Sequence, residues 1–136
     1  EQINWKYGEK GWEPVRLIHE SVDPLKVYQY YNAADVCMVT SLDDGMNLVA
    51  KEYPICAKEH KGALLLSKYT GACPELPTAY HINPFNVSDA VEKLYTALTA
   101  STTEKQQRIE AMRRHLQLND IDMWARKFVE KTFPMI

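Results

Sequence analysis

The chain has 136 residues, of which 16 are Lys or Arg and 18 are Asp or Glu, so its formal net charge at pH 7 is -2. The length suits a single domain. The near-neutral charge lacks the basic excess with which proteins bind nucleic-acid phosphates, so we expect no nucleic acid partner. No run approaches the roughly 18 apolar residues that a membrane-spanning helix needs, so we expect no membrane partner.

The cysteines and histidines indicate neither redox chemistry nor a metal site. Cys37, Cys56 and Cys73 lie too far apart for a CxxC motif. An odd number of cysteines in apolar surroundings is typical of reduced thiols, so we expect a cytoplasmic protein. The four histidines are scattered without the paired spacing of metal ligands, and we expect no metal.

The first part of the chain predicts a loop, a strand and a helix. Residues 1–11 are polar with scattered aromatics and predict a leading loop, and the apolar-leaning run Pro14–His19 predicts a strand. Asp23 and Pro24 are typical of an N-cap and of the first helical position. The helix that they begin has apolar side chains at a helical spacing of three residues, at Leu25, Tyr28 and Tyr31.

The next segments predict two buried strands separated by a helix. The continuous apolar runs Val36–Thr40 and Ala63–Ser67 fit strands that are covered on both faces, as in a parallel sheet. Residues 47 to about 59 have helical composition between them. Pro54 lies inside that segment and predicts a kink or an early end.

The second half of the chain predicts one short strand and three helices. The strand covers 80–83, one helix covers 88–100, and C-terminal helices at about 103–132 begin near residues 103 and 121. Strands that alternate with helices predict an α/β fold with a parallel sheet of four strands. Ligands of such sheets bind beyond the carboxyl ends of the strands, here residues 41–46, 68–73 and 83–87.

The junction after the strand at 36–40 carries the most chemical information. Gly45 lets the backbone approach a ligand closely or adopt a positive φ. A helix begins just beyond it, and the free amides of a helix N-terminus attract an anion. Backbone dipoles rather than a lysine would meet the charge, because the residues there have uncharged side chains: Met46, Asn47, Leu48 and Val49.

Two carboxylates bracket this predicted anion site. Glu52 lies one turn, about 5.4 Å, beyond Leu48 on the same helix face, where it would accept bonds from a hydroxyl pair. Asp44 lies just ahead of the amides and would accept bonds from hydroxyls on the other side. This order favours a nucleotide-sugar. The alternative is that 43–45 is a simple turn and Lys51-Glu52 part of a solvated helix face.

The junction resembles the signature D-G-M-N-L-V-x-K-E-[FY] of the trehalose-6-phosphate synthases, the retaining glycosyltransferase family 20, over residues 44–53. Asp44 and Glu52 also stand at the two ends of the E-x7-E spacing of wider retaining glycosyltransferases of the GT-B fold. Further segments over nearly the whole chain resemble motifs of the same family: 4–14 (F-G-x-x-x-W-x-P), 31–36 (Y-R-A-A-D-V), 67–72 (S-x-F-x-G-A), 83–86 (N-P-W-N) and 124–128 (W-x-x-x-F).

The resemblance implies a Rossmann-like donor-binding domain over residues 1–136, most of the C-terminal half of a GT-B glycosyltransferase. It implies that Asp44 binds hydroxyls of the donor sugar and that the amides of residues 45–49 meet the sugar and diphosphate of UDP-glucose or a similar donor. Glu52 would bind the ribose diol. Glucose would pass to a sugar phosphate, by default glucose-6-phosphate, with retention and by front-face attack, without metal, cofactor or enzyme nucleophile.

The chain departs from the family pattern in several places. Asp43 stands where the family has Arg before the Asp-Gly pair, Lys68 where Glu is frequent, and Phe85 where Trp is frequent. In GT-B enzymes the acceptor site, and the Arg and Lys that clamp the donor phosphates, lie earlier in the chain than Glu1 does here. We therefore expect a fragment, truncated at its N-terminal side, that is inactive without the missing N-terminal GT-B domain.

Two other classes of function remain open. One is a non-catalytic glycosyltransferase-like module that binds nucleotide-sugar or a partner protein, which Asp43 favours. The other is a receiver-like or flavin-binding α/β domain, which leaves residues 47–53 unexplained. The basic residues Arg108, Arg113 and Arg114 are interpreted as a solvated helix face, with a contact to the missing N-terminal half as the alternative.

Overall fold

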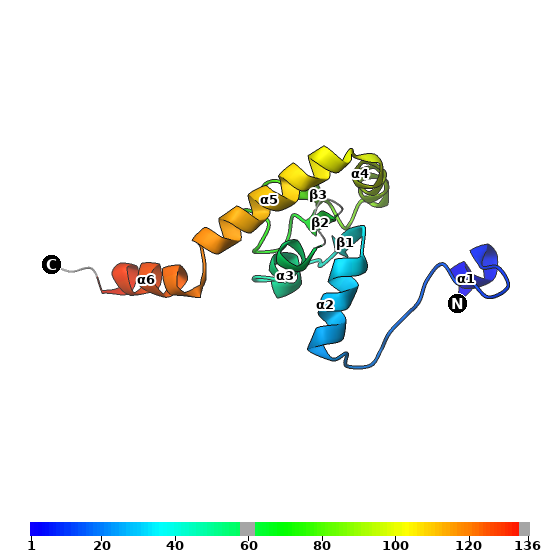
Figure 1. Cartoon of the computed structure of the whole chain (residues 1–136), viewed down its shortest axis with the longest axis horizontal. Coiled ribbons are helices and arrows are strands. Elements are labelled where there is room, and N and C mark those ends of the chain that lie inside the picture. The colour runs from blue at the N-terminus through cyan, green and yellow to red at the C-terminus, as the bar shows by residue number, and fades with distance from the viewer. Residues whose placement is uncertain (58–61, 134–136) are drawn as a thin grey trace.

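The computed structural model describes residues 1–57 and 62–133. Within these ranges the chain forms a short N-terminal helix, a three-stranded sheet and five further helices (Figure 1). The strands are β1 (Val36–Val39), β2 (Ala63–Ser67) and β3 (Tyr80–Ile82). The helices are α1 (Gln2–Tyr7), α2 (Pro24–Ala33), α3 (Leu48–Cys56), α4 (Val87–Thr99), α5 (Thr102–Leu118) and α6 (Ile121–Thr132).

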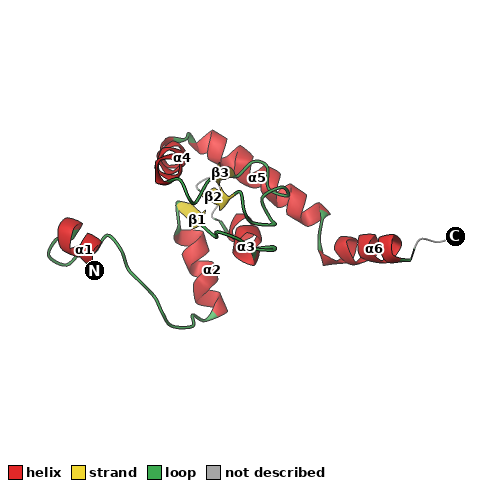
Figure 2. Ribbon diagram, turned by 180° about the vertical axis from the view of Figure 1, so that it is seen from behind, coloured by secondary structure: helices red, strands yellow, loops and turns green. Residues whose placement is uncertain are grey.

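The sheet is parallel, with strand order β1-β2-β3 (Figure 2). Cys37 pairs with Leu64 and Leu65 with Tyr80, so the strands follow one another across the sheet in chain order. The strands at 36–40, 63–67 and 80–83 and the helices beginning near 24, 47, 88, 103 and 121 are confirmed to within one or two residues. The parallel α/β fold expected from the sequence is therefore confirmed, although with fewer strands.

Helices cover both faces of the sheet, so the central strand is buried throughout. Leu64 and Leu66 lie on the face that α3 and α5 cover, while Leu65 lies on the face that α4 covers. Successive side chains of a strand point to opposite faces, which explains why an unbroken apolar run was needed here. The sheet thereby holds the start of α3 at the carboxyl end of β1.

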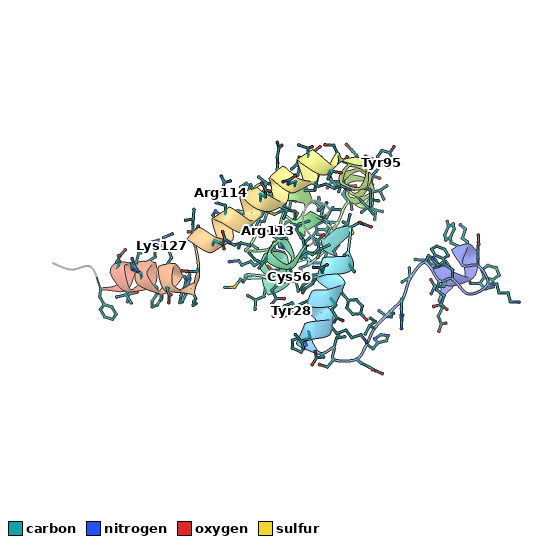
Figure 3. The ribbon with its side chains drawn as sticks, viewed as in Figure 1. Tyr28, Cys56, Tyr95, Arg113, Arg114 and Lys127 are labelled. Atoms are coloured by element: carbon teal, nitrogen blue, oxygen red, sulfur yellow. The ribbon has the colours of Figure 1, made fainter. Side chains whose placement is uncertain are left out.

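Helix α3 ends at Cys56, two residues after its internal proline. The expected continuation to about Glu59 lies outside the described residues. Arg113 on α5 stabilises this end: its Nε donates to Pro54 O at 2.7 Å and its Nη2 donates to Ala57 O. The interpretation of Arg113 as part of a solvated face is therefore wrong. Figure 3 shows Arg113 on the side of α5 that faces α3 and Arg114 on the outer side.

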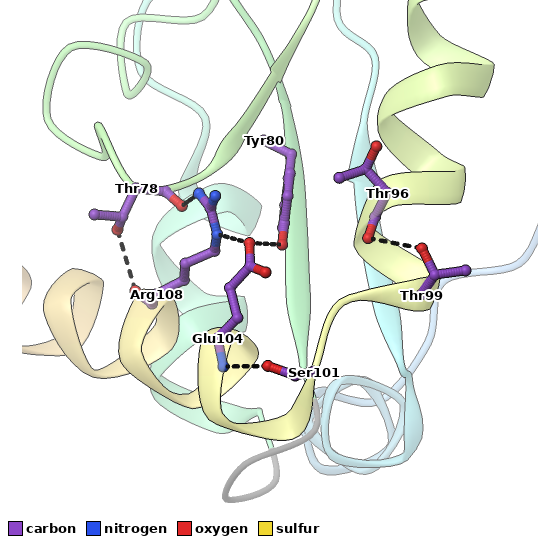
Figure 4. Close-up of polar contacts among 7 residues, drawn as sticks. All are labelled: Thr78, Tyr80, Thr96, Thr99, Ser101, Glu104 and Arg108. Atoms are coloured by element: carbon purple, nitrogen blue, oxygen red, sulfur yellow. Dashed lines mark hydrogen bonds and ion pairs between the residues drawn. The ribbon is translucent and has the colours of Figure 1, made fainter.

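A second polar cluster connects the first turns of α5 to the start of β3 by hydrogen bonds (Figure 4). Glu104 accepts bonds from Tyr80 Oη at 3.0 Å and from Arg108 Nε at 2.9 Å. The Arg108 guanidinium also lies over the Tyr80 ring, 4.2 Å from its centroid, and donates to Thr78 O at 3.0 Å. Arg108, like Arg113, is thus a packing residue of α5.

The segment before α2 differs from the sequence prediction. Residues 1–11 contain α1 instead of only a loop, and Pro14–His19 forms no strand. The reason is visible at Val15, whose N–H donates to Asn4 Oδ1 at 2.9 Å and whose carbonyl accepts from Asn4 Nδ2 at 2.6 Å. The Asn4 side chain thus bonds to the N–H and the carbonyl of Val15, which in a sheet would bond to a neighbouring strand. Leu17 is 72% exposed, so no layer covers the segment.

Helices α1 and α6 extend from opposite ends of the molecule (Figure 1). Helix α6 begins at the N-cap Asp120, and its apolar side chains Trp124 and Phe128 stack with centroids 5.4 Å apart. Among the described residues, no helix is both long and apolar enough to cross a membrane.

The Glu104 cluster predicts a stability loss in acid. The bond from Arg108 and then the bond from Tyr80 lower the pKa of Glu104 below its ordinary value of 4.5. Its ionised form therefore stabilises the fold above pH 4.5, and this contribution disappears as the pH falls through the lowered value. We expect the difference in unfolding free energy between wild type and Glu104→Gln to be larger at pH 6 than at pH 3, measured by urea denaturation.

The same substitution at Glu92, an exposed residue of α4, accounts for the general effect of removing one carboxylate charge. An equal difference between wild type and Glu104→Gln at both pH values would contradict the assignment.

Candidate functional site

The loops that follow β1 and β2 are joined backbone to backbone. The amide of Asp44 donates to Tyr69 O at 3.3 Å, and the amide of Gly71 donates to Asp44 O at 2.8 Å. Beyond them, the amide of Ala72 donates to Met46 O at 2.9 Å. The parallel pairing of the two strands therefore continues into their loops, and it fixes the polypeptide that leads into α3.

The loop after β3 joins the same edge of the sheet. The amide of Lys68 donates to Ile82 O at 3.0 Å, and the rings of Tyr69 and Phe85 meet edge to face with centroids 5.4 Å apart. All three segments that the sequence predicts to surround a ligand therefore lie together. Lys68 and Phe85, two positions where the chain departs from the family pattern, both take part in this packing.

Gly71 permits the closest approach between the first two loops. A Cβ atom on this residue would lie 2.0 Å from Gly45 O and 2.7 Å from Gly45 C. Gly45 itself has nothing within 4 Å of the corresponding position. The steric requirement for glycine at this crossing therefore falls on Gly71, whereas the Cβ side of Gly45 faces open space.

The carboxylate of Asp44 is held by the turn that it precedes. Its Oδ2 accepts from Asn47 Nδ2 at 2.9 Å, and its Oδ1 accepts from the amide of Met46 at 3.0 Å. The Asn47 bond and then the Met46 bond lower the pKa of Asp44 below its ordinary value of 3.8. Asp44 is therefore an ionised hydrogen-bond acceptor with a fixed orientation, in the loop between β1 and α3.

Asn47 has the special backbone conformation of the junction. Its φ is 71°, the only positive φ of a non-glycine residue in the described chain. Its Oδ1 accepts from the amide of Ala50 at 2.9 Å, so Asn47 also caps α3. From the sequence, Gly45 was the residue at which a positive φ could be expected. Asn47 adopts it instead, because Asn tolerates this region better than most residues and its side chain serves as the cap.

The amides at the start of α3 fall into two groups. Those of Met46 and Ala50 already have side-chain acceptors, Asp44 and Asn47 respectively. Leu48 and Val49 are the first two residues of the helix, so their amides have no acceptor within it. Both residues are exposed, at 61% and 40%. Of the amides predicted to form the anion site, those of Leu48 and Val49 are therefore the ones that can attract an anion.

Glu52 lies one turn further along α3 and is partly buried. Its Oε2 accepts from the hydroxyl of Tyr31, at 3.1 Å, across the contact between α2 and α3. Burial and then this bond raise the pKa of Tyr31 to about 12. Tyr31 is therefore a permanent donor to Glu52 near neutral pH. Tyr31 was predicted only as a helix-face residue. The only feature of the sequence that indicated a further role for Tyr31 is its position in the 31–36 segment, which resembles a family motif.

The cation inside the signature segment is neutralised. Lys51 Nζ lies 3.0 Å and 2.9 Å from the two carboxylate oxygens of Glu75, in the loop after β2. The pair joins α3 to that loop. Asp43, at the position where the family has Arg, is exposed. Charge at the start of α3 therefore comes from helix amides and acidic side chains.

The cysteines and His81 show no sign of catalytic or metal chemistry. Burial raises the pKa of Cys37 to about 11 and also raises the pKa values of Cys56 and Cys73, which disfavours a nucleophilic thiolate. His81 Nε2 lies 3.0 Å from Leu76 O, a packing contact. In residues 1–57 and 62–133, no three His, Cys, Asp or Glu side chains gather as a metal ion would need.

The structure thus places the sequence-predicted residues Asp44, Gly45, Met46, Asn47, Leu48, Val49 and Glu52 on one continuous strand-to-helix junction. Comparison with known proteins gives this junction its context. The family model for glycosyltransferase family 20 matches residues 1–132. The chain belongs to this family.

Individual relatives agree with the family match. A trehalose-6-phosphate synthase from Mycobacterium avium is 42% identical over 128 residues, which are 94% of this chain and 26% of the relative. An E. coli trehalose-6-phosphate structure bound with UDP-2-fluoro glucose has a TM-score of 0.91 at 36% identity, covering 99% of this chain and 30% of that one. This chain therefore spans about a quarter of its curated relative.

A third comparison carries a different ligand. The alpha,alpha-trehalose-phosphate synthase (UDP-forming) from Burkholderia xenovorans, in complex with glucose-6-phosphate, has a TM-score of 0.89 at 35% identity. The match covers 96% of this chain and 29% of that one. These likenesses confirm the expected GT-B type of Rossmann-like fold.

The loop crossing predicts a large effect of substitution at one glycine and a small effect at the other. We expect Gly71→Ala to lower the free energy of unfolding by about 1–3 kcal/mol, because the new methyl group collides with backbone atoms of Gly45. Gly45→Ala should change it by no more than about 0.5 kcal/mol, since its Cβ meets open space. Chemical denaturation of both variants measures the contrast, and equal losses would show that the crossing is not tight.

Proposed function

We propose that the chain binds a nucleotide-sugar donor, UDP-glucose or a close analogue, at the start of α3. The observation that carries this proposal is the pair of amides at Leu48 and Val49, two exposed residues at the start of α3, between two carboxylates, Asp44 and Glu52. The likeness to an E. coli structure bound with UDP-2-fluoro glucose supports the donor class.

Each part of the proposed donor has a matching group on the junction. The diphosphate accepts bonds from the amides of Leu48 and Val49, where the helix dipole is positive. Glu52 accepts bonds from the ribose diol through the oxygen that Tyr31 leaves free. Asp44, oriented by Asn47 and Met46, accepts bonds from hydroxyls of the sugar. Helix amides meet the phosphate charge in this scheme, so we propose binding without a metal or cofactor.

We propose that the reaction is retaining transfer of glucose to a sugar phosphate, as in a trehalose-6-phosphate synthase. The Burkholderia xenovorans relative in complex with glucose-6-phosphate supports this acceptor. The proposal gives no residue of this chain the role of nucleophile. Because the chain spans 26% of a curated relative, the proposal assigns the acceptor site and the phosphate-binding cations to a further GT-B domain.

The second candidate function is a non-catalytic module that binds nucleotide-sugar or a partner protein. It is favoured by Asp43, an exposed anion where the family has Arg, and by Glu75, which neutralises Lys51. An anion next to the phosphate site weakens the attraction for a diphosphate, and catalysis needs more charge stabilisation than binding does. Turnover distinguishes the two candidates.

Donor binding is tested by calorimetric titration of the complete gene product with UDP-glucose. We expect Glu52→Gln to raise the dissociation constant about 10- to 100-fold, because a charged acceptor of the ribose diol is lost. Glu92→Gln, the same change at an exposed position of α4, should leave it within about twofold. Unchanged affinity in Glu52→Gln would remove Glu52 from the site.

The reaction is tested by release of UDP from UDP-glucose in the presence of glucose-6-phosphate. We expect turnover by the complete gene product, with an α-configured glucosidic bond detected by NMR. Donor binding without UDP release would favour the non-catalytic module, and an inverted product would contradict the retaining mechanism.

A further inference from the structure

Two tyrosines cross the contact between α2 and α3 in opposite directions. Tyr31 on α2 donates its hydroxyl hydrogen to Glu52 Oε2 on α3, at 3.1 Å. Tyr53 on α3 donates its own to the carbonyl of Ala34, the residue that ends α2, at 3.2 Å. Because neighbouring residues of α3, Glu52 and Tyr53, both bond to the last turn of α2, the two helices cannot shift independently at this point.

The Tyr31 ring is fixed by packing as well as by its hydroxyl. It meets the fully buried ring of Tyr53 edge to face, with centroids 6.1 Å apart and planes at 83°. Tyr28, on the preceding turn of α2, also lies beside the Tyr31 ring, with its centroid 6.4 Å away and the two planes at 48°. A ring held in this way presents its hydroxyl at one place, whereas a glutamate side chain alone has three rotatable bonds and samples many positions.

The bond from Tyr31 leaves Glu52 able to bind a ligand. An ionised carboxylate has two oxygens and about four acceptor positions. Tyr31 occupies one position on Oε2, so Oε1 and the remaining positions are available to a pair of hydroxyl donors. Pre-organisation of this kind improves affinity because the ligand does not have to immobilise the side chain itself.

We infer that Tyr31 is a positioning residue, which orients the carboxylate of Glu52 to accept both hydroxyls of the donor's ribose. This inference rests on the proposed function and deepens it. Tyr31 is called a positioning residue because its hydroxyl contacts the carboxylate of Glu52 and not the ligand. It also gives a role to the 31–36 motif, which the donor site does not otherwise use: residues at the end of α2 determine how well α3 binds a diol.

The test compares two probes, UDP and 2′,3′-dideoxy-UDP, which lacks the hydroxyl pair. Both are titrated into the complete gene product as wild type, Tyr31→Phe, Glu52→Gln and the double variant. The quantity compared is the ratio of the two dissociation constants, because the fraction of folded protein cancels in it. Phe keeps the ring that packs on Tyr53, and Tyr30→Phe removes a hydroxyl from the neighbouring, 43% exposed residue as the matched control.

We expect Tyr31→Phe to weaken UDP binding about 3- to 10-fold and to leave 2′,3′-dideoxy-UDP within about twofold. In the Glu52→Gln background, Tyr31→Phe should have no further effect, because it acts through Glu52. Tyr30→Phe should resemble wild type with both probes.

Other results overturn the inference. Equal weakening of both probes would show a merely structural role for Tyr31, and wild-type affinities in Tyr31→Phe would show that Glu52 needs no such support. In either case the weaker UDP binding of Glu52→Gln would leave the proposed function intact. If wild type binds neither UDP nor UDP-glucose, the proposed function fails and the inference fails with it.

Discussion

The backbone pairing that continues from β1 and β2 into their loops is the constraint on which the candidate site depends. Two parallel strands end at one edge of the sheet, and bonds from Asp44 and Gly71 carry the pairing into the turns. This continuation is possible only because the loop after β2 has no side chain where it crosses Gly45. The crossing fixes the backbone of Asp44, and the bonds from Asn47 and Met46 then fix the direction of its carboxylate.

Much of this arrangement was predictable because it follows from local rules. The unbroken apolar run of β2 required cover on both faces, and Asp23 and Pro24 start α2 as their side chains favour. The order of Asp44, the helix amides and Glu52 along the chain was sufficient to place them on one junction. The carboxyl-edge rule for parallel sheets then located that junction in space.

Contacts between distant segments were not predictable from local patterns. Pro14–His19 has the composition of a strand, but Asn4, eleven residues before Val15, takes the backbone groups that a neighbouring strand would need. The bond from Tyr31 to Glu52 joins residues 21 positions apart, and the Lys51–Glu75 pair joins residues 24 positions apart. The positive φ of Asn47 depends on the partners of its side chain, which the local pattern does not show, whereas Gly45 is the residue whose type alone favours a positive φ.

The proline inside α3 has an electrostatic consequence for the opposite end of that helix. A helix that stops after nine residues has its negative pole only about 13 Å from its first amides, since each residue adds about 1.5 Å. The Arg113 guanidinium lies on the carbonyls of Pro54 and Ala57 at that pole and compensates its partial charge. Because Arg113 compensates the negative charge at the C-terminal end of α3, that end does not reduce the attraction of an anion to the positive N-terminal end at Leu48 and Val49. A short helix capped by a cation in this way acts toward the anion as a localised positive charge.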